Sequence, residues 1–223
     1  MTSTAGRGSN RIVAPELIAV IAPIAFARMV GGMTRILIID GHPDRAEHFL
    51  HAVADAYAEG AESGGHDVRR IEVARLDFPL IRSEQQFHAD DVPCDISAAQ
   101  QAIRWAEHIV VLYPLWLGET PAFFKAFLEQ VARPNFAFAP SDGGFPKGTL
   151  EGRSARMVVT MGMPAPVYKL YYGAHGVKSF KRNILEFVGM DPVRYAMIGS
   201  VDGPEKHRTR WLGRLRRWGE QAH

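Results

Sequence analysis

The sequence predicts an α/β fold in which helices cover both faces of a doubly wound, five-stranded parallel sheet. Two observations lead to this prediction. Short apolar segments alternate with longer amphipathic segments five times along the chain, a pattern typical of parallel strands joined by crossover helices. The segment 109–113 is apolar throughout, as expected for a strand buried on both faces at the centre of the sheet.

The predicted strands are short and rich in β-branched residues, which favour extended structure. The first is RILIID, which ends at a glycine-containing turn, GHPDR. The second alternates polar and apolar residues, which suits the edge of a sheet. The five predicted strands are 35–40, 67–73, 109–113, 154–161 and 192–201.

The predicted helices place their apolar residues on one face. Gly64 and Gly65 follow the first helix and are expected to end it. Thr120 is expected to cap the third helix, with Pro121 at its first position. The five predicted helices are 46–63, 95–108, 120–132, 177–189 and 204–221.

The composition is that of an ordinary globular protein. The chain has 223 residues, of which 47% are hydrophobic and 22% charged, and this length suits one domain. Its net charge of +2 does not suggest binding to nucleic acid. Cys94 is the single cysteine, so the chain cannot form an intramolecular disulfide or a cysteine-rich metal site. A reducing compartment, the cytoplasm, is therefore expected.

Residues 1–33 are expected to form an extension, and residues 34–223 a single domain. Two arginines precede the apolar run 17–27, as in an export signal, but two prolines and a glutamate weaken that pattern. The run is also too short to span a bilayer. Translation from Met33, just before the first strand, is an alternative. We favour a non-structural extension over a working export signal.

Three loops follow predicted strands at the edge of the sheet where α/β proteins bind ligands. GHPDR follows the first strand, PLWLGET follows the third, and MGMPAPVYKLYYGAHG follows the fourth. No GxGxxG motif follows the first strand, so the fingerprint of a tightly held dinucleotide is absent. We expect the three loops to meet and to form one pocket.

Each loop offers a different chemistry to this pocket. GHPDR leads into a helix N-terminus that attracts anions, where His42 and Arg45 are placed to reinforce a phosphate. In PLWLGET, Trp116 and Leu117 offer a flat apolar wall, and the amides of 115–118 are expected to hydrogen-bond a planar heterocycle. Candidate proton donors in the third loop are a phenol and an imidazole. The alternatives are a histidine bonded within its own turn, a packed tryptophan and surface tyrosines.

These motifs together carry a resemblance to a known family. GHP, YPLWLGETPAFFKAFLEQV, TMG and Tyr168 followed by AHG resemble the flavodoxin-like NAD(P)H:quinone oxidoreductases. That family includes bacterial modulators of drug activity and the ancillary proteins of glutathione-gated potassium efflux. The resemblance covers residues 35 to about 200, and P-L-W-x-G-x-x-P-A-x-x-K is its most specific part. It implies a flavodoxin-like sheet with strand order 2-1-3-4-5.

The resemblance also implies an activity and a cofactor. The family members reduce quinones or similar flat acceptors with NAD(P)H by two-electron, ping-pong hydride transfer on a non-covalent FAD or FMN. They usually form homodimers with the active site at the subunit interface. By this resemblance Tyr168 and His175 would be catalytic, over the flavin face. The implied cofactor-binding residues are His42, Arg45, Phe49, Pro114, Leu115, Trp116, Leu117, Thr160, Met161 and Gly162.

The chain departs from the family in three places. DRAEHFL stands where serine, threonine or asparagine often follows the first histidine, Met163-Pro164 replaces a second glycine, and the spacing from Tyr168 to His175 is one residue longer. The first departure leaves FAD and FMN both open.

Other functions are weighed against this enzyme. A regulatory flavoprotein could dock on a membrane transporter, such as a potassium-efflux system, through the basic C-terminal helix. A phospho-acceptor receiver domain would need an acidic acceptor after the third strand, where this chain has Tyr-Pro-Leu. His48 and His51 lack a third ligand nearby in the sequence, so no metal site is expected.

Overall fold

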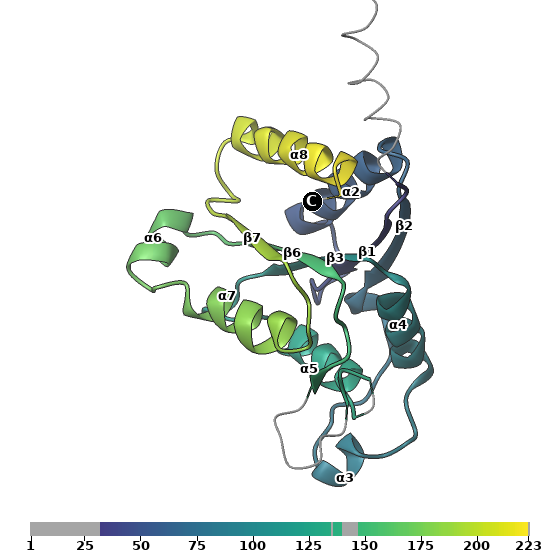
Figure 1. The fold of residues 1–223 in the computed structure, drawn as a ribbon. Helices are drawn as coiled ribbons and strands as arrows, with labels where there is room; N and C mark the ends of the chain where they lie inside the picture. Colours follow the sequence, from purple (N-terminus) through teal and green to yellow (C-terminus); the bar gives the residue numbers. More distant parts are fainter. Residues whose placement is uncertain (1–31, 135, 140–146, 223) are drawn as a thin grey trace, which may run out of the picture. The chain divides into compact units, whose positions relative to one another are not determined.

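A five-stranded parallel sheet forms the centre of the computed structural model, which describes residues 32–134, 136–139 and 147–222 (Figure 1). Its strand order is β2-β1-β3-β6-β7, and all neighbouring strands are parallel. The predicted fold and the predicted order 2-1-3-4-5 are thus confirmed. The strands are β1 (Arg35–Asp40), β2 (Asp67–Glu72), β3 (His108–Pro114), β6 (Ser154–Thr160) and β7 (Val193–Ile198).

The residues from Thr34 onward form the structural unit that contains this sheet. The predicted N-terminal extension concerns residues 1–33, of which 1–31 lie outside the described residues, so it stays a prediction. Within the described ranges, no helix combines the length and apolar character that crossing a membrane requires.

Helices cover both faces of the sheet because alternate strand residues are apolar on both sides. Ile36 and Ile38 of β1 pack with one helix layer, whereas Leu37 and Ile39 pack with the other. The first layer contains α2 (Phe49–Ser63) and α8 (Glu205–Glu220). On the opposite face lie α4 (Cys94–Trp105), α5 (Ala122–Val131) and α7 (His175–Phe180), which continues into a π-helical segment, η3 (Lys181–Glu186) (Figure 1).

The burial of the strands agrees with their positions in the sheet. Every residue of β3 is buried, which confirms that the apolar segment 109–113 is the central strand. β2 has a single buried residue, Ile71, and otherwise consists of exposed and partly buried residues, in agreement with its place at one edge of the sheet. The predicted strand 67–73 stops at Glu72, since Val73 begins a 3₁₀ turn, η2 (Val73–Arg75).

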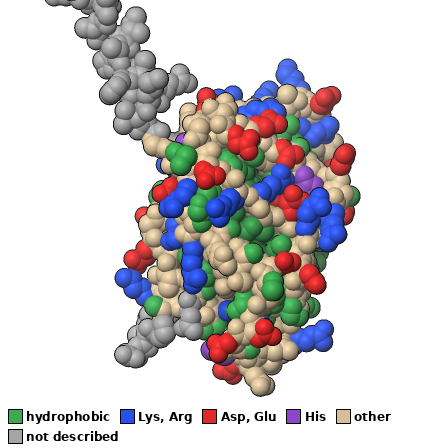
Figure 2. Space-filling view, turned by 90° about the vertical axis from the view of Figure 1, so that its right-hand side faces the viewer, with side chains coloured by type: hydrophobic (Ala, Val, Ile, Leu, Met, Phe, Trp, Pro, Cys, Tyr) green, Lys and Arg blue, Asp and Glu red, His purple; other side chains and the backbone are tan. Residues whose placement is uncertain are grey.

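Charged side chains cover the edge formed by β2. Figure 2 shows this face of the molecule, with Lys and Arg side chains interspersed with Asp and Glu. Arg70 pairs with Asp55, and Arg75 pairs with Glu72. Charged residues on an exposed strand oppose edge-to-edge association of sheets, so this edge is protected against such pairing.

Glycines set the close packing of α2 on α8. A Cβ atom at Gly60 would lie 1.9 Å from the carbonyl oxygen of Arg216, and one at Gly219 would lie 2.1 Å from that of Tyr57. Both distances are far below van der Waals contact, so the helices approach this closely only because neither residue has a side chain. These contacts lie in the C-terminal half of α2.

Several local features differ from the predictions. The first helix begins at Phe49 rather than 46, because residues 43–48 form a loop. Thr120 is not a cap: α5 begins at Ala122, and the preceding Pro121 provides no side-chain hydrogen bond. Four short elements were not predicted: α3 (Glu84–Phe87), β4 (Phe138–Ala139), β5 (Lys147–Gly148) and α6 (Ala165–Leu170).

We expect Gly60→Ala to lower the free energy of unfolding by about 1–3 kcal/mol, because the new methyl group must push α8 away from α2. Gly213→Ala is a matched control in the partner helix, since a Cβ atom there meets nothing within 4 Å. Alanine has a higher helix propensity than glycine, so Gly213→Ala should instead stabilise the protein by up to about 1 kcal/mol. Urea denaturation measures both changes, and equal values for the two variants would contradict this packing.

Candidate functional site

The three predicted loops meet at the carboxyl edge of the sheet and enclose a cavity of about 300 Å³. This volume is at the lower end of the range for small-molecule sites, about 300–1,000 Å³. We call it the sheet-edge cavity. It is lined by His42, His48, Phe49, Leu50, Pro114, Leu115, Trp116, Thr160, Met161, Gly162, Val201 and Asp202.

Most of the residues predicted to bind a cofactor line this cavity. The structure brings eight of the ten together there, and the two exceptions are Arg45 and Leu117. Arg45 lines a neighbouring cavity and donates from its Nε to the carbonyl oxygen of Ala74, at 2.8 Å. The side chain of Leu117 is fully exposed and lines neither cavity. His48, Leu50, Val201 and Asp202 line the sheet-edge cavity and were missed.

One end of the cavity is polar and lies at the N-terminus of α2. His48 is the N-cap residue of this helix, and its side chain makes no capping hydrogen bond. The N–H of His51 donates to the carbonyl oxygen of His48, at 3.0 Å, so the first-turn amides placed to receive an anion are those of Phe49 and Leu50.

His42 lies at this polar end with its ring largely buried. Its Nδ1 lies 3.1 Å from the backbone nitrogen and 3.2 Å from the carbonyl oxygen of Asp44. In the tautomer in which Nδ1 accepts from the Asp44 N–H, Nε2 carries the proton of the neutral ring. The ring stacks on His48, with 4.0 Å between the ring centroids. Burial lowers the pKa of His42, and the neighbouring rings of His48 and His51 lower it further. His42 is thus a neutral donor at pH 7.

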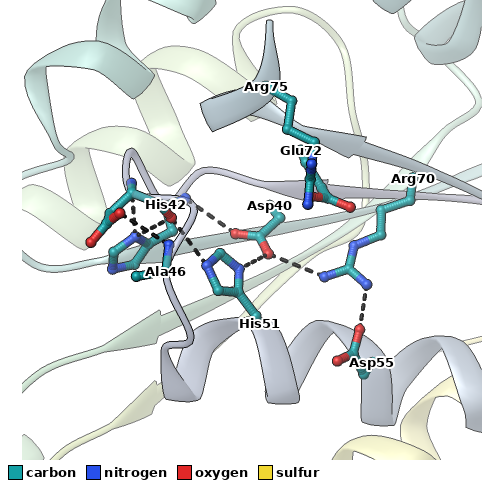
Figure 3. Close-up of polar contacts among 9 residues, drawn as sticks. Asp40, His42, Ala46, His51, Asp55, Arg70, Glu72 and Arg75 are labelled. Atoms are coloured by element: carbon teal, nitrogen blue, oxygen red, sulfur yellow. Dashed lines mark hydrogen bonds and ion pairs between the residues drawn. The ribbon is translucent and has the colours of Figure 1, made fainter.

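A buried carboxylate lies directly beneath the first loop (Figure 3). Asp40 is only 1% exposed and accepts hydrogen bonds from the His42 N–H (3.1 Å), His51 Nδ1 (2.6 Å) and Arg70 Nη2 (3.3 Å). The other ring nitrogen of His51 faces the carbonyl oxygen of Asp44, at 3.1 Å. Both ring nitrogens of His51 thus lie within hydrogen-bond distance of oxygen atoms. A buried charge with several donors is a stable arrangement, and it fixes the loop.

A second cavity of about 860 Å³ adjoins the polar end, and it shares His42, His48 and Phe49 with the first. Its charged lining is mixed. It contains Arg45, Arg70, Arg75 and Arg208 together with Asp40, Glu47, Asp55 and Glu72.

The other end of the sheet-edge cavity is bordered by a tight turn at Trp116. Trp116 and Glu119 exchange two backbone hydrogen bonds of 3.0 Å, and the two residues between them are left-handed, with φ of +49° at Leu117 and +85° at Gly118. This is the conformation of a two-residue hairpin turn. The Trp116 side chain is 49% exposed, so it is not core filler, and it meets the His42 ring edge-on at 6.1 Å.

Two of the four amides that were expected to contact a ligand are used in hydrogen bonds within the protein. The N–H of Leu115 donates to Thr160, at 2.8 Å, and that of Trp116 donates to Glu119. That expectation was wrong for these two positions, which leaves the amides of Leu117 and Gly118 for such contacts. The first of these bonds also joins the second loop to the end of β6.

The two residues expected to be catalytic do not line the cavity. Tyr168, on α6, is 2% exposed and donates from its hydroxyl to the carbonyl oxygen of Gly118, at 2.9 Å. Burial raises the pKa of Tyr168. His175 is exposed at the first position of α7. Among the described residues, no group of three or more His, Cys, Asp or Glu side chains is arranged to hold a metal ion.

Comparison with known proteins agrees with this geometry. A family model described as "Flavodoxin-like fold" matches residues 34–222. FMN-dependent NADH:quinone oxidoreductase 1 of Colwellia psychrerythraea is 33% identical over 172 residues, which cover 72% of this chain and 86% of that protein. FMN-dependent NADH:quinone oxidoreductase 3 of Bacillus cereus is 29% identical over 199 residues, with coverages of 78% and 91%.

Solved structures show the same fold. The NAD(P)H:quinone oxidoreductase from Methanothermobacter marburgensis superimposes with a TM-score of 0.72 at 22% identity, covering 86% of this chain and all of that one (100%). The family match spans nearly the whole described unit and includes the strands and loops that form the cavity. The chain belongs to the flavodoxin-like family of NAD(P)H:quinone oxidoreductases.

Proposed function

We propose that this protein is a flavin-dependent NAD(P)H oxidoreductase that binds FMN in the sheet-edge cavity and reduces quinones or similar flat acceptors. One observation carries the proposal. The cavity combines an apolar wall at Trp116 with an anion-binding end at His42 and the N-terminus of α2, which matches the two ends of a flavin nucleotide.

The residues present fit such a cofactor at both ends. At the polar end, the Nε2–H of His42 and the first-turn amides of α2 are donors for a phosphate. At the apolar end, Pro114, Trp116 and Met161 line the cavity and would contact an isoalloxazine ring. The remaining turn amides and that of Gly162 are the donors for its polar edge.

A bound flavin supplies two-electron hydride transfer, and we propose that the nicotinamide and the acceptor take turns on it in a ping-pong sequence. The protein contributes position and donors. Trp116 orients the ring and limits access of water, and the donors stabilise negative charge that develops at its polar edge. The hydride-transfer roles that the resemblance implies for Tyr168 and His175 stay predictions.

FMN is favoured over FAD by the names of the two relatives, both of which are described as FMN-dependent. The adjoining cavity supports the alternative. It begins at His42 and His48, where a flavin phosphate would lie, and its volume of about 860 Å³ would admit the additional nucleotide half of FAD. Arg45 would contact the cofactor only in that case.

We also propose a homodimer in which a second copy covers the opening of the cavity. Large apolar side chains are exposed on α6 and on the neighbouring turn, and Tyr168 joins these two segments through its bond to Gly118. Exposed apolar patches of this kind mark association surfaces. The exposed residues are Trp116, Leu117, Val167, Leu170, Tyr171 and Tyr172.

Two further parts of the functional hypothesis are the compartment and docking on a membrane transporter, and fewer observations support them. Cys94 is free and exposed, which supports our proposal of the reducing cytoplasm as the compartment. Docking on a membrane transporter through α8 stays a prediction, and no contact in the structure favours it over the enzyme.

The first test is the visible absorption spectrum of the purified protein. We expect flavin bands that bleach on addition of NADH or NADPH, followed by reoxidation when a quinone is added. Chromatography of the chromophore released by denaturation should identify FMN, whereas FAD would assign the second cavity to its nucleotide half. A colourless protein that takes up neither flavin would contradict the proposed function.

Trp116→Ala should weaken FMN binding about 10-fold, which corresponds to about 1.4 kcal/mol, because the ring loses its apolar wall. The half-exposed side chain contributes little to the core, so the thermal midpoint should change little. Leu80→Ala is a matched control, since Leu80 is similarly exposed (52%) and lines neither cavity. Fluorescence titration with FMN measures the difference, and equal affinities for both variants would place the ring elsewhere.

FMN affinity should rise as the pH falls toward the pKa of His42 in the free protein, which lies below the ordinary value of 6.5. The pKa of His42 is lowered in the free protein, and a bound phosphate favours the protonated ring, so binding takes up a proton. Riboflavin lacks the phosphate and should show no such dependence, and His42→Asn should flatten the FMN curve. Titrations at several pH values check this, and parallel curves for FMN and riboflavin would refute a phosphate at His42.

A further inference from the structure

The turn that carries Trp116 is held from behind by α6 and α7. Its two left-handed residues are followed by Glu119. The carbonyl oxygen of Gly118 takes no part in the two hydrogen bonds that close the turn and lies against the start of α7. Two residues of the third loop, Tyr168 and Gly176, meet this one carbonyl group.

Tyr168 binds the carbonyl through its hydroxyl group. The hydroxyl donates to the carbonyl oxygen of Gly118 at 2.9 Å. Its single proton is therefore used within the protein. Burial raises the pKa of Tyr168, and the nearby backbone N–H groups of Val177 and Gly176 act in the opposite direction. With the side chain only 2% exposed, water cannot compete for this bond.

Gly176 allows the close approach on which this bond depends. A Cβ atom at position 176 would lie 2.2 Å from the carbonyl oxygen of Gly118 and 3.0 Å from the carboxyl carbon of Glu119. Any larger residue would separate the start of α7 from the turn. The hydroxyl of Tyr168 thus lies between two backbone segments that are in direct contact.

We propose that Tyr168 is a positioning residue, which fixes the Gly118 carbonyl and thereby holds the Trp116 ring and the Leu117 and Gly118 amides at the sheet-edge cavity. It acts through the turn and does not exchange a proton with the substrate. The proposal rests on the proposed function for its effect on flavin and acceptor. The structural part, that Tyr168 holds the turn, stands without it.

Tyr168→Phe tests this proposal because it removes the hydroxyl and keeps the ring. Tyr113→Phe is a matched control: Tyr113 is also buried, at 1% exposure, but its hydroxyl has no hydrogen-bond partner, so its loss should leave flavin binding unchanged. We expect Tyr168→Phe to raise the Kd for FMN and the KM for the acceptor about 3- to 10-fold, with kcat within twofold of the parent and an unaltered pH profile. This is the range for loss of one hydrogen bond.

A proton donor would behave differently. Its loss would lower kcat by about 100-fold or more and remove one limb of the pH profile, with FMN affinity unchanged, and that result would overturn the proposal. Unchanged kinetics and affinity in Tyr168→Phe would overturn it as well. Gly176→Ala is a second variant, expected to raise the same Kd and KM by displacing the Gly118 carbonyl.

Hydrogen exchange on the flavin-free protein separates this proposal from the proposed function. The Glu119 amide, which donates to Trp116, should exchange several-fold faster in Tyr168→Phe than in the parent or in Tyr113→Phe. If the protein binds no flavin but this exchange accelerates, the proposed function fails and the positioning role survives. If the protein binds flavin and the exchange is unchanged, the positioning role fails alone.

Discussion

A buried carboxylate at the end of β1 holds the first loop of the site, and the polar end of the sheet-edge cavity depends on it. Taking a charge such as that of Asp40 out of water is costly unless donors surround it. His51, Arg70 and the backbone N–H of His42 supply them. These donors come from α2, from β2 and from the loop itself, so one charge joins three parts of the chain.

The second and third loops are held by a different kind of contact. Neutral hydrogen bonds and close backbone approach fix the turn at Trp116, with Tyr168 and Gly176 behind it. In both cases the groups that border the cavity are supported by buried contacts that face away from it. A site built this way is preorganised, because its loops do not have to order themselves when a ligand binds.

The regular elements and the position of the site could be predicted from the sequence because each depends on local patterns. Continuous apolar runs identify β1 and β3, and the topology of parallel sheets brings the loops after them to one edge. α6 was not predicted, since its six residues follow Pro164, contain Pro166 and carry no periodic signal. The buried hydroxyl of Tyr168 on this helix is bonded to the carbonyl oxygen of Gly118, fifty positions away in the chain, and no local pattern reveals such a contact.

The same limit applies to the residues predicted to bind a cofactor. Eight of the ten line one cavity because they belong to continuous motifs that follow strands. The side chain of Leu117 turns outward because of a left-handed backbone conformation that leucine rarely adopts. The buried network around Asp40 was missed since its partners, His51 and Arg70, lie on separate elements and share no motif.

The packing of α2 on α8 has a consequence for biosynthesis. α2 follows the first strand and leaves the ribosome early, yet the helix against which its glycine rests is the last element of the fold. Until that helix has emerged, the apolar face of α2 has no permanent cover. The part of the chain that contains β1 and α2 therefore cannot complete this helix layer by itself, and its apolar face is covered only once α8 has been synthesised.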